Sequence, residues 1–317
     1  MDFQNMRIAI LDDIHNAYGS TAGVRRLRER AEVHIFNVPF GDPSALRGFD
    51  TLVTNRERTR LTRDLLERLP DVRLVVQTGN HVNHIDFAAI RDRGIVVLRA
   101  SGGYSIGAAE LTIGLAIALT RQIPYCDIAV KRGEWPAPST PVLYGKTLGI
   151  VGLGNVGKHV ARIATAFGMR VLAWGPRLTE TIAAAAGTEF RPLDDVMRES
   201  DIVSVQAALK PESRGLIDAR LIGLMKPSAY LINTARGPIV DEAALVAALR
   251  EQRIAGAGLD VFDVEPLPQG HPLTGLSNVI LTPHMGWPTD LAYERFAESV
   301  SEVLLGYLDG REVPRFA

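Results

Sequence analysis

Three polar clusters in the second half of the chain each follow an apolar run directly. They are Asn233-Thr-Ala-Arg236-Gly, Leu259-Asp260-Val-Phe-Asp-Val-Glu265-Pro and Thr282-Pro-His284-Met-Gly286. Arg236 offers a planar fork that suits a carboxylate and can polarise a neighbouring carbonyl oxygen. His284 can deliver a proton near neutral pH, and Glu265 within hydrogen-bond reach would favour the protonated ring and fix its orientation. These residue types fit the reduction of a 2-oxo acid, in which a carboxylate adjoins a ketone.

Each of these side chains has a plain alternative when it is considered alone. An arginine after a strand commonly lies at the surface or in an ion pair. A glutamate before proline commonly lies in a solvated turn, and a histidine near a strand end commonly has a structural role. The functional interpretation depends on all three following successive predicted strands, because open α/β sheets bind ligands at the carboxyl ends of their strands.

A glycine-rich pattern lies in the middle of the chain. The apolar run Leu148–Val151 leads into Gly152-x-Gly154-x-x-Gly157, which encloses Asn155 and Val156 and precedes a helix-compatible segment over residues 158–167. The first glycine allows a tight turn, the second lets backbone amides approach phosphates, and the third allows close packing of helix on strand. The pattern predicts a dinucleotide, a nicotinamide or flavin cofactor, whose pyrophosphate lies at a helix N-terminus. A plain tight turn is the alternative.

The residues after the next predicted strand bear on the choice of nicotinamide cofactor. They read Ala173-Trp-Gly175-Pro-Arg177-Leu-Thr179, without the carboxylate that binds the ribose 2′-hydroxyl of NAD. Gly175 removes the repulsion that a 2′-phosphate would meet, and Arg177 and Thr179 can contact that phosphate. NADP is therefore slightly favoured over NAD, with use of both left open and an exposed Arg177 without such a role as the alternative.

The composition sets limits on the class of protein. The 317 residues are 46% hydrophobic and 22% charged, enough for two domains with substantial cores. The net charge of −1 gives no electrostatic case for nucleic acid or an anionic membrane as partner. A single cysteine, Cys126, excludes an intrachain disulfide and fits a reducing compartment. The apolar stretch at 111–119 is too short to span a bilayer and the N-terminus lacks signal-peptide features, so a cytoplasmic protein is predicted.

The elements that must position these residues alternate between strands and helices. Strands are predicted at Arg7–Leu11, Glu32–Phe36, Thr51–Thr54, Leu74–Gln77, Val96–Leu98, Thr147–Val151, Arg170–Trp174, Ile202–Val205, Ala229–Asn233, Gly256–Leu259 and Val279–Leu281. Helices are predicted at 22–30, 62–69, 105–121, 242–251 and 289–308. The fold class is α/β, with two Rossmann-like domains and doubly wound parallel sheets. Because the glycine pattern is central, a dinucleotide-binding domain (103–288) is nested within a substrate domain (1–102 and 289–317).

Taken together, these motifs resemble the D-isomer-specific, NAD(P)-dependent 2-hydroxyacid dehydrogenase family. The similar segments are the glycine pattern, the three polar clusters, residues 79–86, Gly94-Ile95 and Ala109-Glu110-Leu-Thr112. The resemblance implies that Arg236, Glu265 and His284 are catalytic. It implies that Asp260 binds the nicotinamide carboxamide, that the backbone around Thr234 and Ala235 borders the nicotinamide, and that Gly286 also belongs to the cofactor site.

One segment departs from the family pattern. Family members often place Gly-Val-Gly before Asp-Asn-Ile-Asp, whereas this chain has Thr78-Gly79-Asn80-His81-Val-Asn-His84-Ile-Asp86. The backbone at Gly79, Asn80 and His81 is still expected to hold the substrate carboxylate, but the substrate itself is in doubt. His81 and His84 could be read as a metal pair, yet convincing further ligands are lacking and no metal is predicted.

Three further side chains have expected roles with open alternatives. Arg56 reaches the substrate or lies at the surface, and Trp287 shapes the pocket wall. Trp135 lies where relatives send a loop into the dimer partner's cleft, which implies a homodimer, or it is a packing anchor. The expected function is reduction of a small 2-oxo acid, such as glyoxylate or hydroxypyruvate. The alternatives are a 3-phosphoglycerate dehydrogenase, weakened by the lack of a C-terminal regulatory extension, and a non-catalytic dinucleotide sensor or corepressor.

Overall fold

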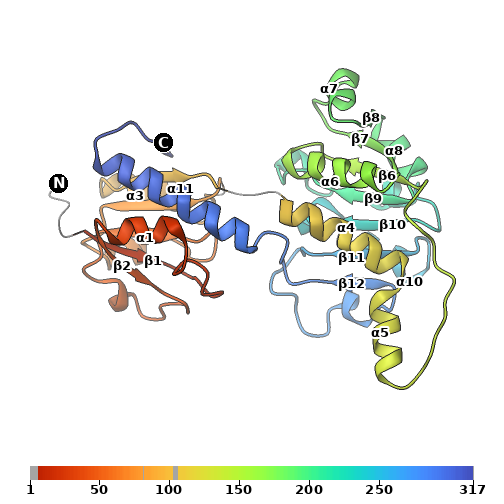
Figure 1. Cartoon of the computed structure of the whole chain (residues 1–317), viewed down its shortest axis with the longest axis horizontal. Helices are drawn as coiled ribbons and strands as arrows, with labels where there is room; N and C mark the ends of the chain where they lie inside the picture. Colours follow the sequence, from red (N-terminus) through yellow and green to blue (C-terminus); the bar gives the residue numbers. More distant parts are fainter. Residues whose placement is uncertain (1–5, 81, 103–105, 317) are drawn as a thin grey trace. The chain divides into compact units, whose positions relative to one another are not determined.

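The computed structural model describes residues 6–80, 82–102 and 106–316. It divides into two compact units, which are treated separately (Figure 1). Unit 1 comprises Met1–Tyr104 and Pro288–Ala317, and unit 2 comprises Ser105–Trp287. Each unit is an α/β domain with a parallel sheet, in agreement with the predicted fold class.

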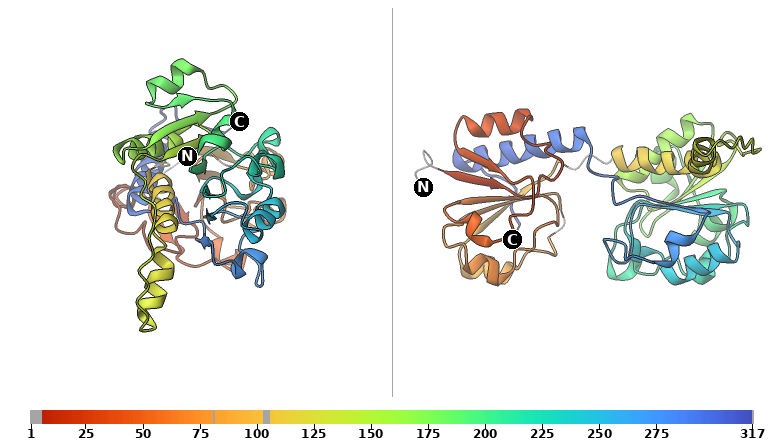
Figure 2. Two further views of the ribbon diagram at one scale, coloured as in Figure 1. Left: turned by 90° about the vertical axis from the view of Figure 1, so that its right-hand side faces the viewer. Right: turned by 90° about the horizontal axis from the view of Figure 1, so that it is seen from below.

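Unit 1 contains a five-stranded parallel sheet in the order β2-β1-β3-β4-β5. Its strands are β1 (Arg7–Ile10), β2 (Glu32–Ile35), β3 (Thr51–Thr54), β4 (Leu74–Thr78) and β5 (Val96–Ala100). Its helices are α1 (Ala22–Arg28), α2 (Arg63–Glu67), α3 (Phe87–Asp92) and α11 (Asp290–Leu308), with a 3-10 turn η2 (Pro43–Leu46). Helices α1 and α11 lie side by side, so the two ends of the chain build one domain (Figure 2).

Unit 2 contains a seven-stranded parallel sheet in the order β12-β11-β10-β9-β6-β7-β8. Its strands are β6 (Thr147–Val151), β7 (Arg170–Trp174), β8 (Glu189–Phe190), β9 (Ile202–Val205), β10 (Tyr230–Asn233), β11 (Gly256–Leu259) and β12 (Val279–Leu281). Its helices are α4 (Ile106–Thr120), α5 (Ile123–Lys131), α6 (Asn155–Ala166), α7 (Glu180–Ala185), α8 (Leu193–Glu199), α9 (Ala219–Ile222) and α10 (Glu242–Arg250). Three 3-10 turns, η3 (Pro211–Ser213), η4 (Gly237–Ile239) and η5 (Pro272–Gly275), complete it.

The central strands of unit 2 are mostly apolar, as expected for a sheet with both faces covered by helices. Successive side chains point to opposite faces, so Leu231 packs into a core formed with α8, α9 and α10. Its neighbour Ile232 packs into a second core, formed with α4 and α6. This alternation explains why the strands read as continuous apolar runs in the sequence rather than as alternating patterns.

The predicted strands are confirmed to within one or two residues at their ends. Helix α6 begins at Asn155, three residues before the predicted segment, because the helix starts inside the glycine pattern itself. The predicted helix at 105–121 is confirmed as α4 over its described part. Strand β8, which has two residues, and short helices such as α9, which has four, were not predicted. Such short elements span too few residues for periodicity to be read.

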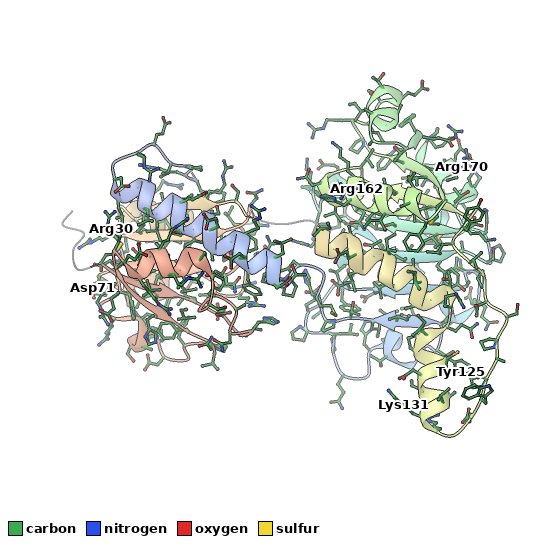
Figure 3. All side chains as sticks on the ribbon, in the orientation of Figure 1. Arg30, Asp71, Tyr125, Lys131, Arg162 and Arg170 are labelled. Atoms are coloured by element: carbon green, nitrogen blue, oxygen red, sulfur yellow. The ribbon has the colours of Figure 1, made fainter. Side chains whose placement is uncertain are left out.

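Helix α5 was also missed, and its composition explains why. Pro124 lies in its first turn, and its apolar side chains Tyr125 and Ile128 are exposed at 56% and 49% rather than forming one buried face (Figure 3). Among the described helices, none alone is long and apolar enough to cross a membrane. Helices α4 and α5, bent by 60° at their junction, meet those criteria only when they are taken together.

Candidate active site

The three polar clusters meet at the carboxyl edge of the unit 2 sheet. They follow β10, β11 and β12, which are neighbours at one side of that sheet. Parallel strands end at the same edge, and this is where such sheets bind ligands. The spatial arrangement of the clusters therefore follows from strand order alone, and the contacts within it show how the side chains are used.

His284 and Glu265 form a close pair. His284 Nδ1 lies 2.7 Å from Glu265 Oε2, and Glu265 Oε1 accepts a hydrogen bond of 3.0 Å from the Phe262 amide. Because a carboxylate only accepts, Nδ1 carries the proton in this pair. Within the described residues Nε2 has no hydrogen-bond partner, and the His284 side chain is 32% exposed. The ring is thus held by one nitrogen while the other remains available.

The charge of Glu265 is stabilised by its surroundings. Partial burial raises the pKa of the Glu265 carboxyl, but the hydrogen bonds from His284 and Phe262, with the charges of His284 and Arg236, outweigh that effect. The net result is a pKa below the ordinary value. Glu265 is therefore ionised at neutral pH and remains an acceptor for the His284 ring.

Asp260 holds the turn that carries His284. The Asp260 carboxylate is fully buried and accepts hydrogen bonds from Thr282 Oγ1 at 2.6 Å, the Met285 amide at 2.8 Å and the Gly286 amide at 2.9 Å. Burial raises the pKa of Asp260, and these hydrogen bonds oppose the rise only in part. His284 lies between these anchors with a φ of 54°, a left-handed conformation that non-glycine residues adopt rarely. Such strain persists only where neighbouring contacts fix the backbone.

Arg236 lies in a loop that contacts the Glu265 loop closely. Its Nη1 donates to the Ala235 carbonyl at 2.7 Å, and Asn233 Nδ2 donates to the Arg236 carbonyl at 3.0 Å. A Cβ placed on Gly237 would lie 2.0 Å from the carbonyl carbon of Phe262, so only glycine allows the two loops to touch. This contact brings Arg236 near enough to Glu265 to lower its pKa.

The glycine pattern forms an open cradle at the start of α6. Gly152 has a φ of 105°, and a Cβ there would lie 2.5 Å from the Ala207 amide nitrogen. A Cβ on Gly154 would meet no described atom within 4 Å, so this position faces open space. Gly154 precedes α6, and no side chain of a described residue caps the helix there, which leaves its first amides available. Free amides at an uncrowded helix N-terminus fit a pyrophosphate.

Comparison with known proteins agrees with this geometry. A family model described as D-isomer specific 2-hydroxyacid dehydrogenase, NAD binding domain, matches residues 113–286. The chain is also 40% identical to the glyoxylate reductase of Aeropyrum pernix over 273 residues, which are 83% of this chain and 80% of that protein. The chain belongs to the D-isomer specific 2-hydroxyacid dehydrogenase family.

Other relatives of the chain have names that indicate a different substrate. The chain is 39% identical to the D-3-phosphoglycerate dehydrogenase of Bacillus subtilis over 297 residues, which are 93% of this chain and 56% of that protein. It spans about half the length of the curated relatives with that name. The solved structure of a phosphoglycerate oxidoreductase from Vibrio cholerae matches with a TM-score of 0.85 and 31% identity, covering 96% of this chain and 99% of that one.

The residues predicted to select the cofactor in this family member lie after β7. Gly175 follows the strand, and Arg177 is exposed and has no hydrogen bond or ion pair within the described part of the chain. Thr179 caps α7, where its Oγ1 accepts from the Ile182 amide at 3.3 Å. The Thr179 hydroxyl proton is therefore not used by the cap. The predicted contacts of both residues with a 2′-phosphate stay predictions.

Arg56 and Gly79, two of the residues predicted to bind substrate, lie together in unit 1. Arg56 has a φ of 62°, and its amide donates to Thr78 Oγ1 at 2.9 Å. A Cβ on Gly79 would lie 2.5 Å from Arg56 Nη1, so the arginine side chain lies against the glycine backbone. Asn80 is exposed, and His81 lies outside the described residues. Trp287 is partly buried at the end of unit 2, and the substrate roles of all five stay predictions.

A hydrogen-bond network beside Thr234 was missed by the sequence analysis. Gln206 Nε2 donates to Thr234 Oγ1 at 3.0 Å and to Thr112 Oγ1 at 3.1 Å, and the two hydroxyls lie 2.7 Å apart. The sequence feature that could have indicated this network is a polar residue directly after β9, the same position that Asp260 has after β11.

Among the described residues, no three His, Cys, Asp or Glu side chains form a group that could hold a metal ion.

The lowered pKa of Glu265 gives a test of its role in stability. Because the pKa of Glu265 in the folded protein lies below its ordinary value, the stabilisation of the fold by the ionised carboxylate is fully present above that ordinary value. It is lost as the pH falls through the folded-state pKa. We expect Glu265→Gln to lower the urea midpoint of unfolding at neutral pH and the two midpoints to converge in acid. Glu212→Gln, at an exposed carboxylate, is the control, and a midpoint difference independent of pH would contradict the expectation.

Proposed function

We propose that the protein is an NAD(P)-dependent D-2-hydroxyacid dehydrogenase that reduces a small 2-oxo acid of the glyoxylate or hydroxypyruvate type. The observation that carries the proposal is the 2.7 Å contact between His284 Nδ1 and Glu265 Oε2, which leaves Nε2 available. This pair lies at the sheet edge that also presents Arg236 and the glycine cradle. An acid, its orienting carboxylate and a carboxylate-binding cation are the set that carbonyl reduction in such a substrate requires.

Each residue has a defined task in the proposed reaction. Arg236 binds the substrate carboxylate and polarises the ketone oxygen. A nicotinamide cofactor held at the glycine cradle would supply a hydride equivalent for the ketone carbon. His284 transfers the Nε2 proton to the ketone oxygen, so that a hydroxyl group forms and the ring becomes neutral. Glu265 holds the ring through Nδ1, and its lowered pKa keeps it charged throughout.

The cofactor site proposed for unit 2 spans the glycine cradle and the ends of β7, β10, β11 and β12. Its residues are Gly152, Gly154, Asn155, Val156, Gly157, Gly175, Arg177, Thr179, Thr234, Ala235, Arg236, Asp260 and Gly286. Asp260 also has a structural role, because both of its carboxylate oxygens already accept hydrogen bonds from the 282–286 turn. A carboxamide contact would be an additional hydrogen bond to an oxygen that is already in use.

The reaction is tested with a panel of glyoxylate, hydroxypyruvate, pyruvate and 3-phosphohydroxypyruvate, following the loss of NADPH or NADH absorbance. We expect turnover with a small 2-oxo acid, and we expect His284→Ala to lower kcat by about 10²- to 10⁴-fold. Coenzyme affinity should stay near the wild-type value because the ring acts on the substrate oxygen.

His159→Ala is the matched control, since His159 lies on α6 and contacts Arg162. Unchanged turnover in His284→Ala would remove this residue as the acid. Preference for 3-phosphohydroxypyruvate would favour the second candidate, a 3-phosphoglycerate dehydrogenase, which relatives such as that of Bacillus subtilis support by name. Tight coenzyme binding without any turnover would favour a dinucleotide sensor.

We propose a slight preference for NADP over NAD. The support is the glycine at position 175, where no carboxylate opposes a 2′-phosphate, and the exposed guanidinium of Arg177. We expect Arg177→Ala to raise KM for NADPH about tenfold, the loss of one charge-assisted hydrogen bond. KM for NADH should not change. Arg162→Ala, on α6, is the control (Figure 3), and tighter binding of NADH than NADPH by the wild type would reject the preference.

We further propose that two copies of the chain form a homodimer. The support is a set of large apolar side chains exposed on α5 and the segment after it: Ile123, Tyr125, Ile128, Trp135 and Tyr144, of which Trp135 is 86% exposed. Apolar patches of this kind commonly mark interfaces. We expect sedimentation analysis to give twice the chain mass and Ile128→Lys to weaken association without loss of helicity. A wild-type protein that sediments as a monomer would refute the proposal.

A further inference from the structure

Gln206 lies at the point of the unit 2 sheet where the strand order reverses. It directly follows β9, and its amide donates to the Val151 carbonyl at the end of β6 at 2.8 Å. Strands β7 and β8 continue the sheet on one side of β6, whereas β9 to β12 continue it on the other. In open α/β sheets this reversal opens the crevice across which a dinucleotide binds. Gln206 therefore lies between the glycine cradle and the clusters that hold Arg236 and His284.

The orientation of the Gln206 carboxamide follows from the protons that its neighbours use. Thr112 Oγ1 donates to the Ala108 carbonyl at 2.7 Å, so its only proton is committed. Thr234 Oγ1, 2.7 Å from Thr112 Oγ1, must then donate to it. Both hydroxyl oxygens can only accept from Gln206, which requires that the amide nitrogen face them. Ser204 Oγ, 2.9 Å from the same nitrogen, adds a third acceptor.

This arrangement leaves the carboxamide oxygen unused. Within the part of the chain that the structure describes, Gln206 Oε1 accepts no hydrogen bond and is not among the buried atoms without a partner. The oxygen is thus a fixed acceptor in contact with solvent at the switch point.

We propose that Gln206 Oε1 accepts a hydrogen bond from a hydroxyl group on the nicotinamide half of the dinucleotide, and that Thr112 is a positioning residue that locks the carboxamide for this contact. The inference rests on the proposed coenzyme binding. It extends that proposal by assigning a ligand contact to Gln206, directly after β9, and an indirect role to Thr112 on α4, a helix that packs against α6.

The test compares the affinities of four variants and the wild type for NADPH, NADH and ADP, measured by nucleotide fluorescence and by competition. ADP contains the adenosine and both phosphates but lacks the nicotinamide riboside. We expect Gln206→Leu to raise Kd for both reduced coenzymes about 3- to 10-fold, the loss of one neutral hydrogen bond. Kd for ADP should stay within about 1.5-fold of the wild-type value, because the cradle is untouched.

The Thr112 variants test whether the Thr112 hydroxyl holds the Gln206 carboxamide in its orientation. We expect Thr112→Val, which keeps the side-chain shape, to raise Kd for the coenzymes about 2- to 4-fold, because the Gln206 carboxamide would no longer be held in one orientation. Thr112→Ser keeps the hydroxyl and should restore wild-type affinity. Thr120→Val is the matched control, because Thr120 is also buried on α4 and donates back to a helix carbonyl, that of Ala116. It should leave all three affinities unchanged.

Several outcomes would overturn the inference. An unchanged coenzyme Kd in Gln206→Leu would exclude the contact, and an equal loss of ADP affinity would show a disturbed fold instead. A coenzyme Kd of Thr112→Ser that differs from the wild-type value would exclude the positioning role of the Thr112 hydroxyl. A wild type that binds neither coenzyme would reject the proposed function together with this inference, whereas a wild type that binds coenzyme but reduces no 2-oxo acid would reject the reaction alone.

Discussion

The geometry of the site depends on the buried carboxylate of Asp260. It accepts hydrogen bonds from one side chain and two backbone amides of the 282–286 turn, and each hydrogen bond to a charged group is worth about 1.5–3 kcal/mol. Without these anchors the left-handed backbone of His284 would relax, and its ring would no longer face Glu265. A carboxylate without solvent contact is costly in itself, as its raised pKa shows. The conformation of the 282–286 turn therefore requires that the Asp260 carboxylate be kept out of contact with water.

The loops after β10, β11 and β12 contact one another, and each contact restricts the position of the next loop. The Arg236 loop touches the Phe262 backbone because Gly237 has no side chain, and the Phe262 amide binds Glu265. Glu265 holds His284, and the turn of His284 returns to Asp260 in the loop that also contains Phe262. A displacement of any one loop changes the position of the others. The side chains of Asp260, Glu265 and His284 are thus held by a combination of backbone and side-chain contacts.

Much of this arrangement could be predicted from the sequence, since long apolar strands fix the sheet and polar residues after them fix the edge. The pairing of His284 with Glu265 was expected, and its distance confirms the contact. The network of Gln206, Thr112 and Thr234 could not be predicted, because its members are 94 and 122 residues apart and none has a diagnostic type. The hydrogen bonds that both Asp260 oxygens accept could not be predicted either. The sequence identifies Asp260 as a residue that could bind the cofactor, but it does not show which protein groups Asp260 already binds. Helix α9 and strand β8 were too short for their patterns to be recognised.

The nested order of the two units has a consequence for how the chain acquires its structure. Unit 2 is built from one continuous stretch, Ser105–Trp287. Unit 1 depends on contacts of great sequence separation, such as the Ala22 amide with Glu294 and the Phe316 amide with the Val97 carbonyl. During synthesis, which proceeds from the N-terminus, the five strands of unit 1 therefore emerge first and must wait for α11 to cover them. The unit whose strands are made first is therefore the unit that is completed last.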